Sequence, residues 1–355
     1  MRTIVVVFFL FQSFRFDVNA FGLSYHFYEK TCPQVEDIVR DGLRPLFLTD
    51  PTSPAALLRL MFHDCQVQGC DASVLVDPGS GSDATEMKAN KNFGIRRREL
   101  ISIVKSMVEA QCPQQVSCAD ILILAAREAV AASGGPWINV PLGRRDSSQA
   151  PSYRLADALL PPATTGVVDM LNIFSKKGMT LAESVAILGA HTLGISHCSN
   201  IQNRLYGHKN GELRAMEPSF AAFLRLTCRD GSLASNLSFV LNDPTPFAFD
   251  NQYYVNAMRG RGLVRIDAEM VSDPRTVGLM QHFAMNEGDF FRVFSSAFVK
   301  LSGYGVLTGK QGVVRKNCYE ISTRPFFRRR ELFPVTVAKC LIRHNNGRKI
   351  LTSSI

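Results

Sequence analysis

The sequence predicts a mainly α-helical fold, because helix-starting signals recur along the chain whereas alternating strand patterns are short and few. The chain of 355 residues is long enough for one large domain or for two lobes around a cleft. No repeat with a period of roughly 20 to 50 residues is present, which argues against solenoids and propellers. The stretch 136–162 is richer in proline, glycine and serine, so we expect it to link two helical lobes. A cleft between such lobes is a usual place for a cofactor.

Two of the expected helices begin with capping signals. Ser117 begins one over Ile121–Ala132, and Thr180, followed three residues later by Glu183, begins another that runs toward Gly189. Further helical patterns cover Val35–Phe47, Leu100–Ala110, Val167–Lys176, Ser219–Thr227, Gln252–Arg259, Arg275–Met285 and Asp289–Leu301.

The N-terminus has the pattern of a secretory signal peptide over residues 1–20. Arg2 provides the charged start, residues 3–11 the apolar run and residues 18–20 the small-residue cleavage pattern. A membrane span is the alternative, but the run is too short and charged residues follow it. No later stretch is long and apolar enough to cross a bilayer, so we expect no membrane span.

Secretion would place the nine cysteines in an oxidising compartment, where eight can pair. Cys340 is the natural unpaired one, because it lies in an atypical tail. Zinc binding is a poor competitor, since no two CxxC pairs occur. Asn236, in Asn-Leu-Ser, is the acceptable glycosylation position and is consistent with secretion.

The formal charge of +9 is concentrated in the tail. After Cys318, eight arginines and lysines stand against Glu320 and Glu331, a net charge of +6. A basic surface on a secreted protein can bind acidic polysaccharides. Nucleic-acid binding would need a basic face interleaved with aromatic residues or a known motif, and the sequence has neither.

The first candidate site lies on a helix that Ser53 and Pro54 introduce and that covers Ala55–Phe62. Arg59 and His63 are four residues apart, so both project from one helix face. A permanent guanidinium charge beside a proton-accepting imidazole suits chemistry that moves a proton and stabilises negative charge. The alternative is a buried structural histidine. The oxygen-bearing residues and cysteines that follow are expected in a pinched loop: Asp64, Cys65, Cys70, Asp71 and Ser73.

A second histidine, His191, lies near the C-terminal end of the helix that Thr180 begins. Its alternatives are a C-capping imidazole or a core histidine. Asp267 is a candidate acceptor for its ring N–H, a pairing that orients a metal-bound histidine and raises its basicity. Three nearby residues provide oxygens for a hard cation: Thr192, Thr245 and Asp250.

These residues and several ordered motifs resemble the secretory plant peroxidases, the class III haem peroxidases. The resemblance runs from about Phe27 to Cys318. It rests on Phe27-Tyr28, Thr31-Cys32-Pro33, Arg59 to Ser73, Val116 to Ile121, Val140 to Asp146, Leu160-Pro161-Pro162, Gly189 to Gly194, Arg204-Leu205-Tyr206, Phe249-Asp250-Asn251, Tyr253-Tyr254 and Leu307-Thr308-Gly309.

The resemblance implies two helical lobes with one haem b between them and reduction of H₂O₂ through a ferryl intermediate. His191 would be the axial iron ligand, and Asp267 would give it imidazolate character. His63 would be the distal base, with Arg59 stabilising the charge that develops as the O–O bond breaks. Asn92 would orient His63. Phe62 would cover the distal haem face, and Pro161 would contact phenolic donors through its carbonyl.

The resemblance also implies two Ca²⁺ ions and four disulfides. The distal Ca²⁺ set is Asp64, Val67, Gly69, Asp71, Ser73 and, through water, Glu86. The proximal set is Thr192, Thr245, Ala248 and Asp250, with Asn242 where the family has an aspartate and Asp243 one position later. Either the proximal site is weaker, or a backbone shift lets Asp243 serve. The expected disulfides are Cys32–Cys112, Cys65–Cys70, Cys118–Cys318 and Cys198–Cys228.

Three departures from the family pattern have consequences. Gln66 replaces a usual phenylalanine, which predicts a more polar pocket beside the distal histidine. Gln68 stands where asparagine is common. One residue is missing after Asn92, which puts its contact with His63 in question.

The expected organisation is a signal peptide at 1–20, a peroxidase domain at 21–318 and a basic extension at 319–355. The distal lobe would cover 21–145 and the proximal lobe 146–318. We expect a monomer in the apoplast or cell wall, with the vacuole as the alternative. A secreted haem-binding or cell-wall-binding homologue with little turnover is the competing function.

Overall fold

Helices dominate the structure, as the sequence predicts. The computed structural model describes residues 22–77, 83–207, 216–230 and 237–321, which all belong to one unit of the chain, while the unit 323–355 lies outside them. The expected signal peptide, Asn236, Cys340 and the basic run of the tail therefore fall outside the described residues. None of the helices in the described part combines the length and apolar character that a membrane span requires.

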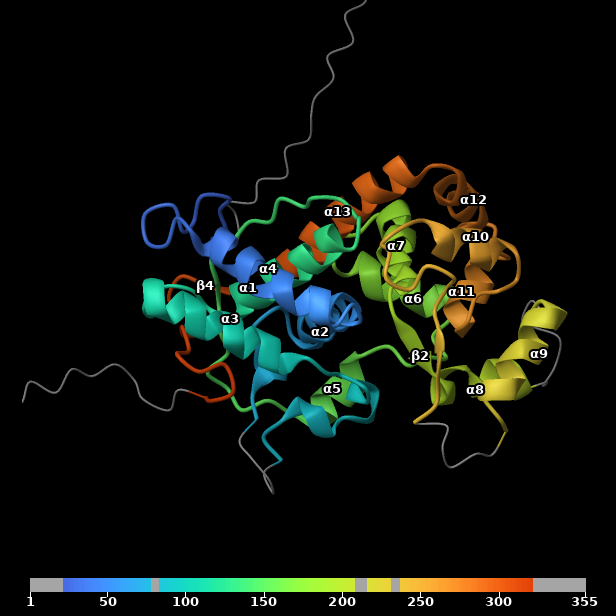
Figure 1. The fold of residues 1–355 in the computed structure, drawn as a ribbon, viewed down its shortest axis with the longest axis horizontal. Coiled ribbons are helices and arrows are strands. Elements are labelled where there is room, and N and C mark those ends of the chain that lie inside the picture. The colour runs from blue at the N-terminus through green and yellow to red at the C-terminus, as the bar shows by residue number, and fades with distance from the viewer. Residues whose placement is uncertain (1–21, 78–82, 208–215, 231–236, 322–355) are drawn as a thin grey trace, which may run out of the picture. The chain divides into compact units, whose positions relative to one another are not determined.

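The elements follow each other in the order shown in Figure 1. The α-helices are α1 (Val35–Thr49), α2 (Ser53–Val67), α3 (Arg98–Gln111), α4 (Cys118–Ala132), α5 (Tyr153–Leu159), α6 (Val167–Ser175), α7 (Leu181–Ile187), α8 (Cys198–Tyr206), α9 (Pro218–Thr227), α10 (Gln252–Met258), α11 (Arg265–Met270), α12 (Val277–Met285) and α13 (Glu287–Gly303). Short 3₁₀ helices are η2 (Ser73–Leu75), η3 (Glu86–Lys88), η4 (Asn90–Asn92) and η5 (Leu188–Thr192). The strands are β1 (Arg144–Arg145), β2 (Ile195–His197), β3 (Phe239–Leu241) and β4 (Leu307–Thr308).

The strands form two small antiparallel pairs. β1 pairs with β4, and Arg144 lies opposite Thr308. β2 pairs with β3, and Ile195 lies opposite Leu241. The second pair joins the segment after His191 to the segment that carries the candidate proximal cation residues, so it brings parts of the site together.

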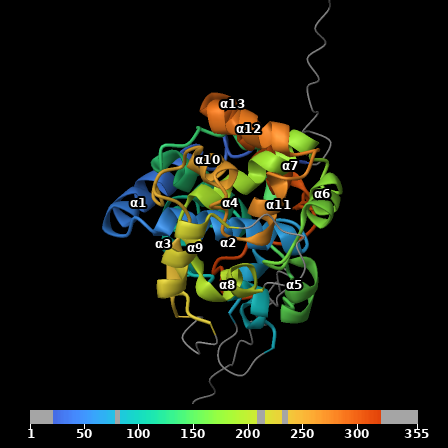
Figure 2. The same cartoon turned by 90° about the vertical axis from the view of Figure 1, so that its right-hand side faces the viewer.

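The helices form two groups that share one core. α1 to α4 pack against one another, and α6, α7 and α10 to α13 form a second group (Figures 1 and 2). α13 packs on α7 and α12 and also reaches α2, so it joins the groups. Buried apolar side chains from both groups belong to one cluster. α8 and α9 have a smaller core of their own around Cys198 and Cys228.

Several predicted boundaries need correction. Ser53 is the first residue of α2 and not its N-cap, which is Thr52 without a side-chain cap. The helix also continues beyond Phe62 to Val67, because packing of α2 on α4 outweighs the modest helix propensities of its last turn. His63, Asp64 and Cys65 are therefore helical, and the loop begins only after Val67.

Two predicted capping signals are confirmed, and three helices were missed. The Ser117 side chain accepts from Asp120 N at the start of α4, and Thr180 and Glu183 form a full capping box at the start of α7. The missed helices are α5, α8 and α11. α5 lies inside the predicted linker, where the Ser152 side chain caps its first turn. It packs on α2, η3 and η4, so the linker itself contributes to the surroundings of the candidate site.

All four expected disulfides are present. They are Cys32–Cys112, Cys65–Cys70, Cys118–Cys318 and Cys198–Cys228. Cys118–Cys318 spans 200 residues and fastens the last described segment to the start of α4. Cross-links over long sequence separations restrict the unfolded chain the most in the loop-entropy account.

Candidate active site

A cavity of about 480 Å³ contains both predicted histidines. α2 contributes Arg59, Phe62 and His63, whereas η5 contributes His191. The volume of the cavity lies within the range of cofactor and small-molecule sites. Other lining residues come from several elements: Phe93, Arg96, Pro161, Phe174, His197, Asn242, Tyr253, Arg261 and Asp267.

Helical spacing brings Arg59 and His63 into direct contact. Arg59 Nε donates to His63 Nε2 at 3.2 Å, and Arg59 Nη2 donates to the Phe93 carbonyl at 2.9 Å. Because His63 Nε2 accepts, the ring proton belongs on Nδ1, which lies 2.6 Å from Asn92 Oδ1. Burial, followed by the Arg59 charge, lowers the pKa of His63 to about 3. The imidazole is therefore neutral and able to accept a proton over the whole physiological range.

Asn92 reaches His63 although one residue is missing after it. η4 places its buried amide so that Nδ2 donates to the Glu86 carbonyl at 2.8 Å while Oδ1 faces His63 Nδ1. Both ends of the amide are thus fixed. Further along the same segment, Arg97 adopts a left-handed φ of 67° at the start of α3. The contact that the departure had put in question is present.

His191 and Asp267 come together across 76 positions of sequence. His191 Nδ1 lies 3.1 Å from Asp267 Oδ1. Asp267 also accepts from the Tyr253 hydroxyl at 2.8 Å and from Val264 N at 3.0 Å. Burial alone would raise the pKa of Asp267, but the hydrogen bond and charge of His191, with those two donors, lower it. The carboxylate stays ionised and holds Nδ1, so Nε2 is the ring nitrogen left for a ligand.

The cavity fits haem b on the chemistry of its donors. His191 offers a nitrogen ligand, and His63 faces the same space from the opposite helix group. Among the described lining residues, Asp267 is the only acid, and its charge is committed to His191. Cations line the same cavity and suit a ligand with carboxylate groups: Arg59, Lys91, Arg96 and Arg261.

The predicted distal Ca²⁺ residues lie around the loop that follows α2. Asp64 is fully buried, accepting from Ala72 N at 2.9 Å and Val74 N at 3.3 Å. Burial and then the nearby Asp71 and Glu86 carboxylates raise the pKa of Asp64 well above its usual value. Val67 ends α2, and Gly69, at φ +108°, lies so close to the backbone of residue 305 that a Cβ would overlap it.

This distal set fits a hard cation. Ser73 Oγ and Glu86 Oε2 are buried without hydrogen-bond partners, next to two further buried carboxylates. Buried oxygens of this kind are costly unless a cation or donor compensates them. Within the described residues, no three acidic, histidine or cysteine side chains form a metal site by themselves. The set therefore depends on the Val67 and Gly69 carbonyls and on Ser73 as well.

The predicted proximal Ca²⁺ residues also cluster, with one exception. Thr192 Oγ1 donates to Asp243 Oδ2 at 2.6 Å and lies 2.9 Å from Asp250 Oδ1. Thr245 N donates to Asp243 Oδ1 at 2.8 Å, and Ala248 N donates to the Thr245 carbonyl at 2.9 Å. These oxygen atoms again suit Ca²⁺.

Asn242 lies outside this proximal cluster. Its Oδ1 accepts from Ser196 Oγ at 2.8 Å, and its Nδ2 donates to the Leu193 carbonyl at 2.7 Å. The neighbouring Asp243 occupies the cluster instead. Of the two alternatives from the sequence, the geometry favours the one in which Asp243 serves.

Gln66 does not make the pocket beside His63 more polar, and that prediction is wrong. Gln66 does not line the cavity, and its Nε2 donates to the Leu159 carbonyl at 3.3 Å. The helix continues through this position, so Gln66 is turned by roughly 60° from His63 and faces α5. Because α5 was not predicted, sequence reasoning had no partner for this amide.

The sequence alone gave no role to Tyr253 or to the cations that line the cavity beside Arg59, namely Lys91, Arg96 and Arg261. Tyr253 belongs to a motif of the resemblance, and its position three residues after Asp250 was the available signal. Its hydroxyl is one of the donors to Asp267, and its ring meets His191 edge-on at 5.7 Å. Lys91 directly precedes Asn92 and Arg96 follows it by four residues, yet only the fold shows that both border the cavity.

Comparison with known proteins agrees with this arrangement. The family model described as Peroxidase matches residues 39–286. Peroxidase 29 of Arabidopsis thaliana is 53% identical over 308 residues, covering 86% of this chain and 91% of the relative. Peroxidase 28 of the same plant is 42% identical, covering 86% and 95%. Cationic peroxidase SPC4 of Sorghum bicolor is 41% identical over 300 residues, covering 84% and 81%. The chain therefore belongs to the class III plant peroxidases and is a haem peroxidase.

Proposed function

We propose that the chain reduces H₂O₂ at a haem b held by His191 and oxidises phenolic donors by one-electron steps. The observation that carries the proposal is the placement of His63 and His191 on one cavity, each fixed by a second side chain at Nδ1. Bound haem would supply the iron for peroxide reduction and the oxidising equivalents for the donors.

The roles of the side chains follow from their contacts. His63 Nε2 would accept a proton from H₂O₂ and return it to the oxygen that leaves as water, while Asn92 keeps the ring proton on Nδ1. Arg59 would stabilise the negative charge on the departing oxygen. Asp267 would hold the proton of His191 and raise the basicity of its ligating nitrogen. Pro161, at the cavity wall beyond α5, is the proposed contact for the aromatic donor.

The two oxygen clusters are proposed as Ca²⁺ sites. The distal one comprises Asp64, Val67, Gly69, Asp71, Ser73 and Glu86, and the proximal one comprises Thr192, Asp243, Thr245, Ala248 and Asp250. We further propose secretion to the apoplast or cell wall, with acidic polysaccharide as a surface partner for the basic tail.

The second candidate function is haem binding with little turnover. It is favoured by the Arg59 Nε contact with His63 Nε2, because that nitrogen must be free to accept the peroxide proton. In this alternative Arg59 stays in place and blocks the base.

One measurement separates the candidates. Purified, haem-loaded protein is treated with one equivalent of H₂O₂ and then with guaiacol, while the Soret absorbance band is recorded. An active peroxidase shifts the band and regains the original spectrum with the donor. A Soret band that does not respond to peroxide would contradict the proposal and support the second candidate.

A further inference from the structure

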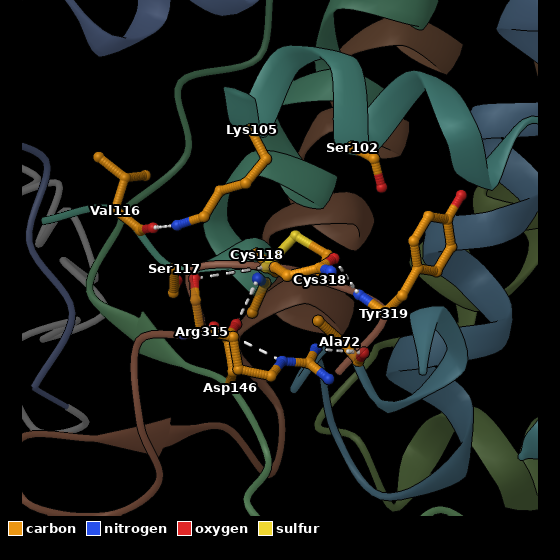
Figure 3. Close-up of a disulfide and its surroundings, with 12 residues drawn as sticks. Ala72, Ser102, Lys105, Val116, Ser117, Cys118, Asp146, Arg315, Cys318 and Tyr319 are labelled. Atoms are coloured by element: carbon orange, nitrogen blue, oxygen red, sulfur yellow. Dashed lines mark hydrogen bonds and ion pairs between the residues drawn. A yellow bond between two sulfur atoms is a disulfide. The ribbon is translucent and has the colours of Figure 1, made fainter. Parts of the chain in front are cut away.

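The last described segment returns to the distal loop through one buried arginine. Arg315 is wholly buried, and its Nη2 donates to the Ala72 carbonyl at 2.6 Å. Figure 3 shows its guanidinium lying between Asp146 and Ala72, beside the Cys118–Cys318 disulfide. Arg315 and Ala72 are 243 positions apart, so this contact joins the C-terminal segment of the domain to the distal loop.

Arg315 is fixed at its backbone by Asp146 and by the disulfide. Its N–H donates to Asp146 Oδ2 at 2.8 Å, and Asp146 Oδ1 accepts from Ala119 N at 2.8 Å in the first turn of α4. Cys118, at the start of the same helix, is bonded to Cys318, three residues after Arg315. Asp146 and the disulfide thus hold the segment around Arg315 against one helix end.

On the other side, Ala72 is the last residue of the distal loop and the N-cap of η2. It adopts a left-handed φ of 59°, a conformation that costs a non-glycine residue free energy unless its surroundings impose it. Its N–H donates to Asp64, and its carbonyl accepts from Arg315. Ala72 therefore has both of its backbone polar groups fixed, between the proposed Ca²⁺ ligands Asp71 and Ser73.

The buried Arg315 guanidinium makes one ion pair and one side-chain hydrogen bond. Nε lies 3.8 Å from Asp146 Oδ2 in a buried ion pair, whereas Nε and Nη1 have no hydrogen-bond partner. Removal of one partner from such a buried pair lowers stability, because the other charge is left unpaired. The side-chain hydrogen bond that Arg315 does make goes to the loop, which points to a role there.

We propose that Arg315 is a positioning residue for the distal cation loop, and that the Cys118–Cys318 disulfide holds it in place. Loss of either then weakens Ca²⁺ binding by this loop. The inference rests on the distal Ca²⁺ site of the proposed function. It adds that the oxidation state of a disulfide in the C-terminal segment controls the cation affinity of a loop next to His63.

The test measures amide hydrogen exchange of peptides covering residues 65–77 in full-length, haem-loaded protein at buffered free Ca²⁺ concentrations. In Arg315→Met, the Ca²⁺ concentration for half-maximal protection should rise about tenfold, the scale of one charge-assisted hydrogen bond. Lys316→Met is the matched control, because it removes an exposed cation from the adjacent position and should stay within about twofold. An unchanged or tighter midpoint in Arg315→Met would overturn the positioning role, since removal of a merely repulsive charge strengthens cation binding.

The disulfide arm uses Cys118→Ala with Cys318→Ala, compared with Cys198→Ala with Cys228→Ala. The first pair should raise the Ca²⁺ midpoint of the loop in the same direction as Arg315→Met, and the second should leave it unchanged. The Cys118→Ala, Cys318→Ala protein also replaces Arg315→Met as the test if Arg315→Met does not fold. A wild-type Ca²⁺ midpoint in this double variant would overturn the coupling between the disulfide and the loop. If hydrogen exchange of the loop in wild-type protein does not depend on Ca²⁺ while H₂O₂ still shifts the Soret band, the inference is wrong and the proposed function stands. If H₂O₂ does not shift the Soret band, the proposed function is wrong.

Discussion

Replacement of Asn92 by alanine tests how the proposed distal base is held. The Asn92 amide joins His63 Nδ1 at 2.6 Å to the Glu86 carbonyl at 2.8 Å, and both His63 and Asn92 are buried. Alanine leaves a buried N–H and a buried carbonyl unpaired, which should lower the free energy of unfolding by about 2 to 4 kcal/mol. It also frees the ring to rotate and to exchange tautomers. Because general base catalysis contributes about 10²–10⁴ in rate, we expect kcat/KM for H₂O₂ to fall roughly 10- to 100-fold.

The assay is stopped-flow absorbance of the Soret band at varied H₂O₂, together with urea unfolding of the same preparations. Asn92→Asp keeps the acceptor oxygen and should retain more of the rate than Asn92→Ala. Asn172→Ala in α6, which removes an exposed amide, is the control and should change neither quantity. A peroxide rate constant within about twofold of wild type in Asn92→Ala would refute the reasoning.

Three further predictions follow from the other contacts. Asp267→Asn removes the charge that holds His191 Nδ1, so haem transfer from the variant to an acceptor globin should be roughly tenfold faster or more than from wild type. Equal transfer rates from the variant and from wild type would contradict the pairing. Since the pKa of His63 is lowered to about 3, the rate constant with H₂O₂ should stay flat from neutral pH down to about pH 4 and then fall, and a decline centred near pH 6.5 would show an ordinary imidazole. Burial raises the pKa of Glu86 to about 7, so the folded, cation-free protein retains a proton that the unfolded chain releases near 4.5. Raising the pH across this interval should destabilise chelator-treated protein by about 3 kcal/mol but not Ca²⁺-loaded protein, as thermal unfolding at pH 5 and pH 8 would reveal.

The parts of the site that depend on one helix were predictable from spacing. Arg59 and His63 were placed on one face from their four-residue separation, and their side chains are in direct contact. The distal loop was likewise predictable, because oxygen-bearing side chains stand on both sides of a closely spaced pair of cysteines. These inferences needed no knowledge of how the helices pack.

The remaining contacts depend on tertiary packing, and the residues alone could not give them. His191 and Asp267 were candidates for pairing, but only the fold of α10 and α11 brings them together and adds Tyr253. The comparison with the family's phenylalanine places Gln66 in the pocket, and only the fold shows that its amide meets the Leu159 carbonyl of α5 instead. The sequence does not single out Arg315, because its hydrogen bond to the Ala72 carbonyl joins positions 243 residues apart.

The distal loop and the proposed base are connected more closely than their separate roles suggest. Glu86 belongs to the proposed distal cation set through its carboxylate, while its carbonyl accepts from Asn92, whose other end contacts His63. Asp64 precedes the same loop and directly follows His63 in α2. Without a cation, mutual repulsion and burial favour protonation or displacement of these carboxylates. Any displacement of η3 moves the carbonyl that orients Asn92. We therefore expect removal of Ca²⁺ from the loop to change how His63 is held, and with it the rate constant for H₂O₂. A rate constant that is identical with and without Ca²⁺ would show that the loop and the base are not coupled.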